Sequence, residues 1–154
     1  MEFSFSECNL SDLMNNVYQT HRLLMPEGVE LKIEKPEEAV MLNTDKHRLT
    51  QVITNFINNA SKFTRSGYIK IGYSYNPKRL AVDIFVEDTG IGIPKEKQKA
   101  VFERFNKLDE FAQGTGLGLA ICQVIIHRFG GVIELESEEN KGSCFTISLP
   151  LVIS

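Results

Sequence analysis

The pattern of apolar and polar positions is clearest from Asp45 to Phe63, where it predicts one amphipathic helix. Its apolar residues recur at spacings of three and four and therefore share one face: Leu49, Val52, Ile53, Phe56, Ile57 and Ala60. A second stripe, beside the first, carries Asn55, Asn59 and Lys62. Because asparagine is a poor helix former, this polar stripe indicates either a site for a hard cation and a phosphate chain or a plain solvated face.

The same reasoning predicts the other elements. Helices are expected from Asn9 or Ser11 to about Met25, around Lys97–Phe105, and from Leu117 to Phe129. Strands are expected at Val29–Ile33, Ala39–Leu42, Tyr68–Tyr75, Arg79–Glu87, Val132–Ser137 and Cys144–Leu149. Residues 1–7 fit either a linker or the approach to the first helix. The last four strands come as two hairpins, which favours a two-layer α/β sandwich with helices on one face of a mixed, largely antiparallel sheet.

Composition narrows the class of protein. The chain has 154 residues, 42% hydrophobic and 24% charged, which suits one compact domain with its own core. A net charge of −3 gives no electrostatic reason to expect nucleic acid as a partner. Cys8, Cys122 and Cys144 are scattered without metal-binding spacing, which favours a reducing compartment.

The chain contains no apolar run approaching the roughly 20 residues that span a bilayer, and no signal peptide. We therefore expect a cytoplasmic location. The chain is also compatible with one domain cut from a longer protein, such as an inner-membrane sensor that keeps this domain in the cytoplasm.

Asp88 stands where a strand ends and a glycine-bearing turn begins. The alternate residues before it are apolar and are expected to face the helices: Leu80, Val82, Ile84 and Val86. Asp88 continues that alternation, so its carboxylate is expected on the inner side, where it needs a partner such as adenine N6. The alternative is an aspartate that only nucleates the turn. Gly90 and Gly92 would let a flat ligand approach the backbone closely.

A second glycine segment lies directly before the last predicted helix, at Gly114, Gly116 and Gly118. Free amides at a helix N-terminus form an anion site, although a flexible loop is the alternative, and the spacing matches neither a P-loop nor GxGxxG. Residues 101–113 between the two glycine segments are expected to form a mobile lid. In it, Arg104 and Lys107 are either phosphate contacts or plain surface charges.

These stretches, in this order, resemble the ATP-binding catalytic domain of two-component sensor histidine kinases. The resemblance runs from about Phe5 to Leu151, with an N box at 55–62, a G1 box at 88–92, an F box at 102–105 and a G2 box at 114–118. It implies the Bergerat (GHKL) fold, with a mixed, mostly antiparallel five-stranded sheet and helices on one face. It also implies that residues 1–154 form a single catalytic domain.

The resemblance also implies roles for individual residues in catalysis and in binding of ATP and Mg²⁺. Asn59 would coordinate Mg²⁺, with Asn55 supporting the metal or a water. Lys62 and Lys107 would contact phosphate, and Asp88 would accept a hydrogen bond from adenine N6. Further nucleotide contacts are implied for Phe63, Gly90, Gly92, Ile93, Gly114, Thr115, Gly116, Leu117, Gly118, Leu119 and Thr146.

The implied reaction transfers the γ-phosphoryl group to a histidine on a separate dimerisation domain, which in turn serves a response regulator. Related ATPases place a glutamate where Asn55 stands, and an amide cannot act as a general base, so hydrolysis is expected to be suppressed. His21, His47 and His127 are each followed by arginine, unlike the family's phosphoacceptor. We therefore expect the acceptor domain to be absent from this chain, and the isolated domain to be monomeric and unable to phosphorylate itself.

Two other functions stay open. One is a serine kinase of the anti-sigma-factor type, which uses the same fold. The other is a non-catalytic nucleotide-sensing or scaffold module. The F box and the form of residues 114–121 favour the histidine kinase, and the presence of Asn59, Asp88 and the box glycines argues against a dead domain.

Overall fold

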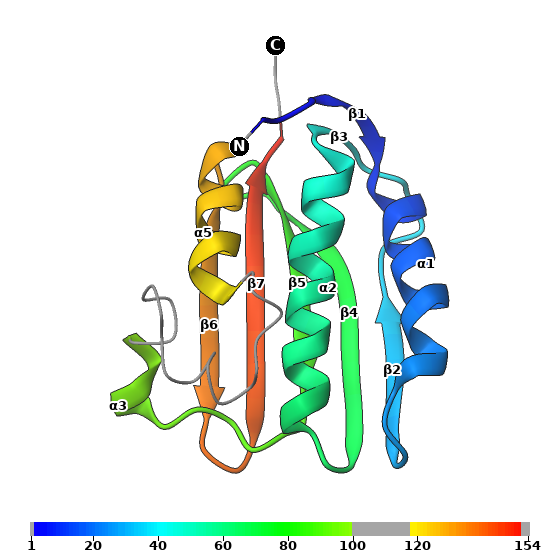
Figure 1. The fold of residues 1–154 in the computed structure, drawn as a ribbon. Helices are drawn as coiled ribbons and strands as arrows, with labels where there is room; N and C mark the ends of the chain where they lie inside the picture. The colour runs from blue at the N-terminus through cyan, green and yellow to red at the C-terminus, as the bar shows by residue number, and fades with distance from the viewer. Residues whose placement is uncertain (1, 100–117, 152–154) are drawn as a thin grey trace.

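The computed structural model describes residues 2–99 and 118–151, and these form two layers (Figure 1). One layer is a five-stranded sheet: β2 (Val29–Glu34), β4 (Gly67–Asn76), β5 (Ala81–Asp88), β6 (Val132–Glu138) and β7 (Gly142–Pro150). The other layer consists of three helices that lie over one face of the sheet: α1 (Leu10–His21), α2 (Lys46–Phe63) and α5 (Gly118–Arg128). The predicted two-layer sandwich is confirmed.

The order of strands in the main sheet is β2-β4-β5-β7-β6. Only β2 and β4 pair in parallel, whereas the other three pairs are antiparallel. The sheet is therefore mixed and mostly antiparallel, as expected. The two predicted hairpins, β4–β5 and β6–β7, lie side by side because β5 pairs with β7. This arrangement brings the end of β5 next to the start of β7, although more than 50 residues separate them.

Helix α2 forms the centre of the helical layer. It begins after Asp45, whose side chain caps the helix by accepting a hydrogen bond from the Arg48 backbone N–H at 3.1 Å. The apolar face that the sequence predicts is buried, including Ile53, which is 0% exposed. Burial of such a side chain stabilises the fold by about 1.5–3 kcal/mol. Among the residues that the structure describes, no helix has the length and apolarity needed to cross a membrane.

A small second sheet was not foreseen. β1 (Ser6–Asn9) pairs antiparallel with β3 (Met41–Thr44) and takes no part in the main sheet. The sequence leaves residues 1–7 open and places the strand at Ala39–Leu42, which is two residues too early. The register pairs Cys8 with Leu42, and both side chains are buried in the core. Burial of these two apolar side chains stabilises the pairing.

Several boundaries also differ from the prediction. Helix α1 ends at His21, and a 3₁₀ turn η1 (Arg22–Leu24) follows it, instead of one helix to Met25. Helix α3 (Lys95–Gln98) begins directly after Pro94, and the rest of the predicted helix to Phe105 lies outside the described residues. Leu80 does not face the helices, because it lies in the turn before β5 with a φ of 50° and is 51% exposed.

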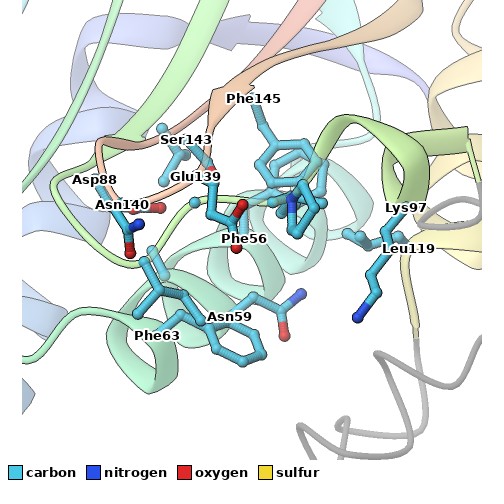
Figure 2. A pocket seen from close by; sticks show the side chains of 16 residues that line it. Phe56, Asn59, Phe63, Asp88, Lys97, Leu119, Glu139, Asn140, Ser143 and Phe145 are labelled. Carbon is cyan, nitrogen blue, oxygen red and sulfur yellow. The ribbon is translucent and has the colours of Figure 1, made fainter.

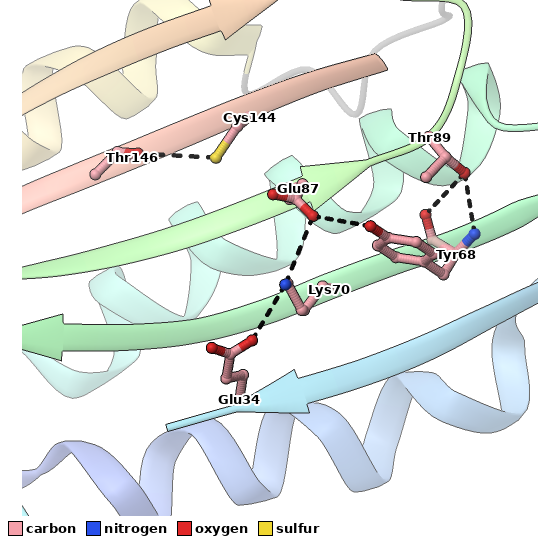
Figure 3. A network of polar contacts seen from close by, with 7 residues as sticks. All are labelled: Glu34, Tyr68, Lys70, Glu87, Thr89, Cys144 and Thr146. Atoms are coloured by element: carbon pink, nitrogen blue, oxygen red, sulfur yellow. Dashed lines mark hydrogen bonds and ion pairs between the residues drawn. The ribbon is translucent and has the colours of Figure 1, made fainter. Parts of the chain in front are cut away.

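The face of the sheet away from the helices is polar. Lys70 on β4 bridges two carboxylates, Glu34 at 3.1 Å and Glu87 at 3.8 Å, and the Tyr68 hydroxyl donates to Glu87 at 3.2 Å (Figure 3). Such exposed ion pairs contribute little to stability. They do identify this face as the solvated one, and the hydrophobic core lies on the helix side.

Candidate functional site

A cavity of about 400 Å³ lies on the helix side of the sheet (Figure 2). Its lining comes from α2, from the ends of β5 and β7, from the turn after β5, from α3, from the start of α5 and from the β6–β7 turn. Small-molecule sites in proteins commonly measure about 300–1,000 Å³. The position between the layers is the one expected of a ligand cleft.

Asp88 forms one end of the cavity. Its side chain is only 8% exposed, and its Oδ1 accepts a hydrogen bond from the Gly90 backbone N–H at 2.9 Å. Burial raises the pKa of the carboxyl, and the backbone N–H groups of Gly90 and Ser143 partly offset that rise. Asp88 therefore faces the helix side of the sheet, as the alternation along β5 predicts. Asp88 also makes the turn contact with Gly90 that the sequence allows as an alternative, and its contact with adenine stays a prediction.

The turn after β5 packs against two other segments through its glycines. A Cβ on Gly90 would stand 2.4 Å from the carbonyl oxygen of Phe63, at the end of α2. A Cβ on Gly92, whose φ is 71°, would stand 2.0 Å from the carbonyl oxygen of Glu138 at the end of β6. A side chain at either position would push the turn away from its neighbours. The two glycines thus fix the wall beside Asp88.

The polar stripe of α2 only partly reaches the cavity. Asn59 is one of the residues that line it (Figure 2). Asn55, one helical turn away, is 4% exposed and donates from Nδ2 to the Cys122 sulfur at 3.3 Å. Lys62 is exposed and is not one of the lining residues that the structure describes. The roles given to Asn55 and Lys62 from the sequence stay predictions.

Other residues named from the sequence line the cavity, lie elsewhere in the structure, or lie outside the described part of the chain. Phe63, Gly92, Ile93 and Leu119 line the cavity together with Asp88 and Asn59. Gly118 begins helix α5, and five further residues lie outside the described part of the chain: Lys107, Gly114, Thr115, Gly116 and Leu117. The structure therefore brings together the N box and the G1 box.

Thr146 is misplaced by the sequence reasoning. On β7, Phe145 lines the cavity, so its neighbour Thr146 points to the opposite face of the sheet. There the Thr146 hydroxyl lies 3.9 Å from the Cys144 sulfur, on the side that carries Lys70 (Figure 3). The expectation that Thr146 contacts a nucleotide in this cavity is wrong, because its side chain lies on the opposite face of the sheet. The β7 residue that lines the cavity beside Asp88 is Ser143, which the register sets directly opposite Asp88.

Several lining residues were not singled out from the sequence. Phe56 and Phe145 stack with their ring centroids 4.9 Å apart and join α2 to β7 beside the cavity. Ser143 could have been found from strand alternation, because it shares its face with Phe145. Two groups carry no local signal that points to the cavity: Lys97 on α3, and Glu139 with Asn140 in the β6–β7 turn.

The oxygen atoms that line the cavity suit a metal ion only if a bound ligand supplies further coordinating atoms. Within residues 2–99 and 118–151, no group of three or more His, Cys, Asp or Glu side chains could hold a metal ion. The Asn59 carboxamide oxygen is a suitable hard ligand at the cavity wall. Magnesium is usually held by one or two protein oxygens together with substrate phosphates and water. The residues present therefore fit a magnesium ion that arrives with a phosphate chain.

Comparison with known proteins adds independent findings. The family described as histidine kinase-, DNA gyrase B-, and HSP90-like ATPase matches residues 44–153, which include both boxes around the cavity. A curated relative, sensor protein SrrB of Staphylococcus aureus (strain NCTC 8325 / PS 47), is 43% identical over 110 residues. The match covers 69% of this chain and 19% of SrrB, so the chain spans about a fifth of the length of that relative.

Solved structures of histidine kinases share the fold. The catalytic domain of ThkA superposes with a TM-score of 0.83 at 32% identity, and the match covers 96% of each chain. Full-length ShkA in complex with AMPPNP gives 0.87 at 28% identity, over 100% of this chain and 32% of ShkA. ThkA in complex with the response regulator protein TrrA gives 0.78 at 30% identity, over 96% of this chain and 42% of ThkA.

Proposed function

The chain belongs to the family of histidine kinase-, DNA gyrase B-, and HSP90-like ATPases, and from this premise we propose that its cavity binds ATP with magnesium. We further propose that the chain is the catalytic module of a sensor histidine kinase. The observation that carries the proposal is that a buried carboxylate, Asp88, and the Asn59 carboxamide line the same cavity. The relatives known as sensor or histidine kinases support the choice within the family.

Asp88 would recognise the base of the nucleotide. Its carboxylate accepts hydrogen bonds only, so it selects a purine that presents an exocyclic amine over one that presents a carbonyl. The Gly90 and Ser143 backbone N–H groups hold the carboxylate in place and favour its ionised form. The stacked rings of Phe56 and Phe145, with Val86, supply an apolar wall for a flat ring. Adenine therefore fits this end of the cavity better than guanine.

Asn59 would act at the other part of the ligand. Its carboxamide oxygen is positioned to ligate a cation held by phosphates, and a bound magnesium ion would supply neutralisation of phosphate charge. The protein's own contribution to phosphoryl transfer is positioning and electrostatic stabilisation. Asn55, an amide, donates to Cys122 and cannot activate water as a base. This chemistry favours transfer to an incoming acceptor over hydrolysis.

We propose that the acceptor is a histidine on a separate dimerisation domain, with a response regulator as the indirect partner. Within this chain, His21 is buried, with Nδ1 2.9 Å from the Val17 carbonyl oxygen, and is therefore a poor acceptor. The solved complex of ThkA with TrrA supports a response regulator as the kind of protein that follows in the relay.

The experiment separates the candidate functions by the chemistry of the product. The chain is incubated with γ-labelled ATP and magnesium, together with either a histidine-bearing helical hairpin or a serine-bearing partner protein. Acid-labile label on the hairpin supports the histidine kinase, whereas acid-stable label on the serine partner would make the chain a serine kinase. Binding of ATP without transfer to either would favour a sensing module. Calorimetry that detects neither ATP nor ADP binding would end the proposal.

A further inference from the structure

The cavity has an uneven charge distribution. Its described lining contains two carboxylates, Asp88 and Glu139, and one cation, Lys97. The Lys97 ammonium makes no ion pair within 4.0 Å with another residue of the described chain. Lys62, the cation expected from the sequence in the N box, does not line the cavity. Lys97 is therefore a candidate binding residue that was not identified from the sequence.

The backbone at Lys97 is held in a defined place. Lys97 donates its N–H to the Pro94 carbonyl at 2.9 Å, which closes the first turn of α3. The neighbouring Gln98 donates from Nε2 to the carbonyl oxygens of Ile93 at 2.9 Å and Ser137 at 3.0 Å. The bond to Ser137 fastens α3 to β6, so Gln98 faces the sheet, whereas Lys97 lines the cavity. The direction of Lys97 is thus set by contacts that do not involve its own side chain.

The ammonium lies at the end of the cavity away from Asp88. Figure 2 shows the Lys97 side chain running from α3 past Leu119 toward the side where the Asn59 carboxamide lies. Leu119 is the second residue of α5 and directly follows the second glycine segment. If the base lies at Asp88, the phosphate chain must extend toward Asn59 and the start of α5. The Lys97 ammonium is therefore on the phosphate side.

We propose that Lys97 contacts the phosphate chain of the bound nucleotide and thereby favours nucleoside polyphosphates over the nucleoside. This inference rests on the proposed nucleotide binding and goes beyond it by naming the residue. An ammonium on a flexible stem offers three donors and makes charge-assisted hydrogen bonds to phosphate oxygens. Since Lys97 is exposed, salt screens the contact, and its loss should weaken binding by only about 3- to 10-fold.

The test uses Lys97→Ala, with Lys95→Ala as the matched control. Lys95 is on the same short helix and carries the same charge, but it does not line the cavity. Calorimetry with magnesium measures the affinities for ATP, ADP and adenosine at low and at high salt. Lys97→Ala should bind ATP about 3- to 10-fold more weakly at low salt, with a smaller loss at high salt, and should bind adenosine as the unaltered chain does. Lys97→Arg should stay within about twofold for ATP.

Each other outcome counts against the inference in its own way. Equal ATP affinities for Lys97→Ala and Lys95→Ala would overturn it and leave the proposed nucleotide binding intact. An equal loss for ATP and adenosine would also overturn it, because that result would show packing of the apolar stem in place of a charge contact. If the unaltered chain bound neither ATP nor ADP, both the inference and the proposed function would fall. Thermal unfolding of every variant checks that the fold is retained.

Discussion

Replacement of Asp88 by asparagine separates what this residue does for binding from what it does for the fold. The substitution keeps the size of the side chain and an oxygen that can accept from the Gly90 N–H, now 2.9 Å away. It removes the negative charge and places an NH₂ group where a carboxylate oxygen faced the cavity. A hydrogen bond to a charged group contributes about 1.5–3 kcal/mol. The affinity for ADP and for adenosine should therefore fall about 10- to 150-fold.

The same substitution should not destabilise the fold at neutral pH. Burial raises the pKa of Asp88 above its usual value of 3.8, so the folded state favours the protonated carboxyl. The stability that this preference provides is present below pH 3.8 and is lost as pH rises through the raised folded-state pKa. At pH 7 the ionised carboxylate carries a cost of burial that exceeds the stabilisation from the Gly90 and Ser143 N–H groups. The amide avoids that cost, although its single oxygen accepts less strongly from the same two groups. Asp88→Asn should unfold at the same temperature as the unaltered chain or higher, and this difference should shrink as pH is lowered.

The assay pairs calorimetry with thermal unfolding over a pH series. Asp83→Asn is the matched control, because Asp83 lies on the same strand but on the opposite face, where it accepts from Asn76 at 3.0 Å. The control should bind ADP normally. Unchanged ADP affinity in Asp88→Asn would remove Asp88 from the binding site, and a lower unfolding temperature at pH 7 would refute the desolvation argument.

Further variants test other parts of the molecule. Asn59→Asp should weaken Mg–ATP binding far more than adenosine binding, because the added charge faces the phosphates; equal losses in calorimetry would contradict the metal role. Gly92→Ala should weaken ADP binding, because its Cβ would stand 2.0 Å from the Glu138 carbonyl and displace the turn; normal affinity would show that the wall beside Asp88 is compliant. Ile53→Ala should lower the free energy of unfolding, measured in urea, by about 2–5 kcal/mol, because the side chain is fully buried. The control Leu23→Ala, at a site 81% exposed, should change it by less than about 0.5 kcal/mol.

Periodicity predicted the elements whose faces are buried along their whole length. Helix α2 is the clearest case, since both its apolar face and its acidic N-cap are local features of the sequence. On β5 the alternation correctly placed Val82, Ile84, Val86 and Asp88 on the helix side. It failed at Leu80, because a turn residue with positive φ continued the apolar alternation by coincidence. An alternating pattern alone does not mark where a strand begins.

The site was predicted less completely than the fold, for physical reasons that differ between residues. Ser143 was within reach, since it shares the inward face of β7 with Phe145, and the choice of Thr146 overlooked that alternation. Lys97 was out of reach, because its direction depends on the Gln98 contact with the Ser137 carbonyl, about 40 residues away along the chain. The pairing of β1 with β3 is equally non-local.

The two ends of the cavity are built on different physical principles, and this difference decides how variants should be interpreted. The base end is fixed by backbone contacts that exclude a Cβ, and a Cβ on Gly142 would likewise stand 2.0 Å from the Asp88 carbonyl. A substitution there changes the shape of the wall before it changes any contact with ligand. The phosphate end instead presents the flexible, exposed Lys97, whose contribution is electrostatic and screened by salt. A loss of affinity that disappears at high salt therefore points to the Lys97 contact, whereas one that persists points to the wall beside Asp88 or to the Asn59 carboxamide.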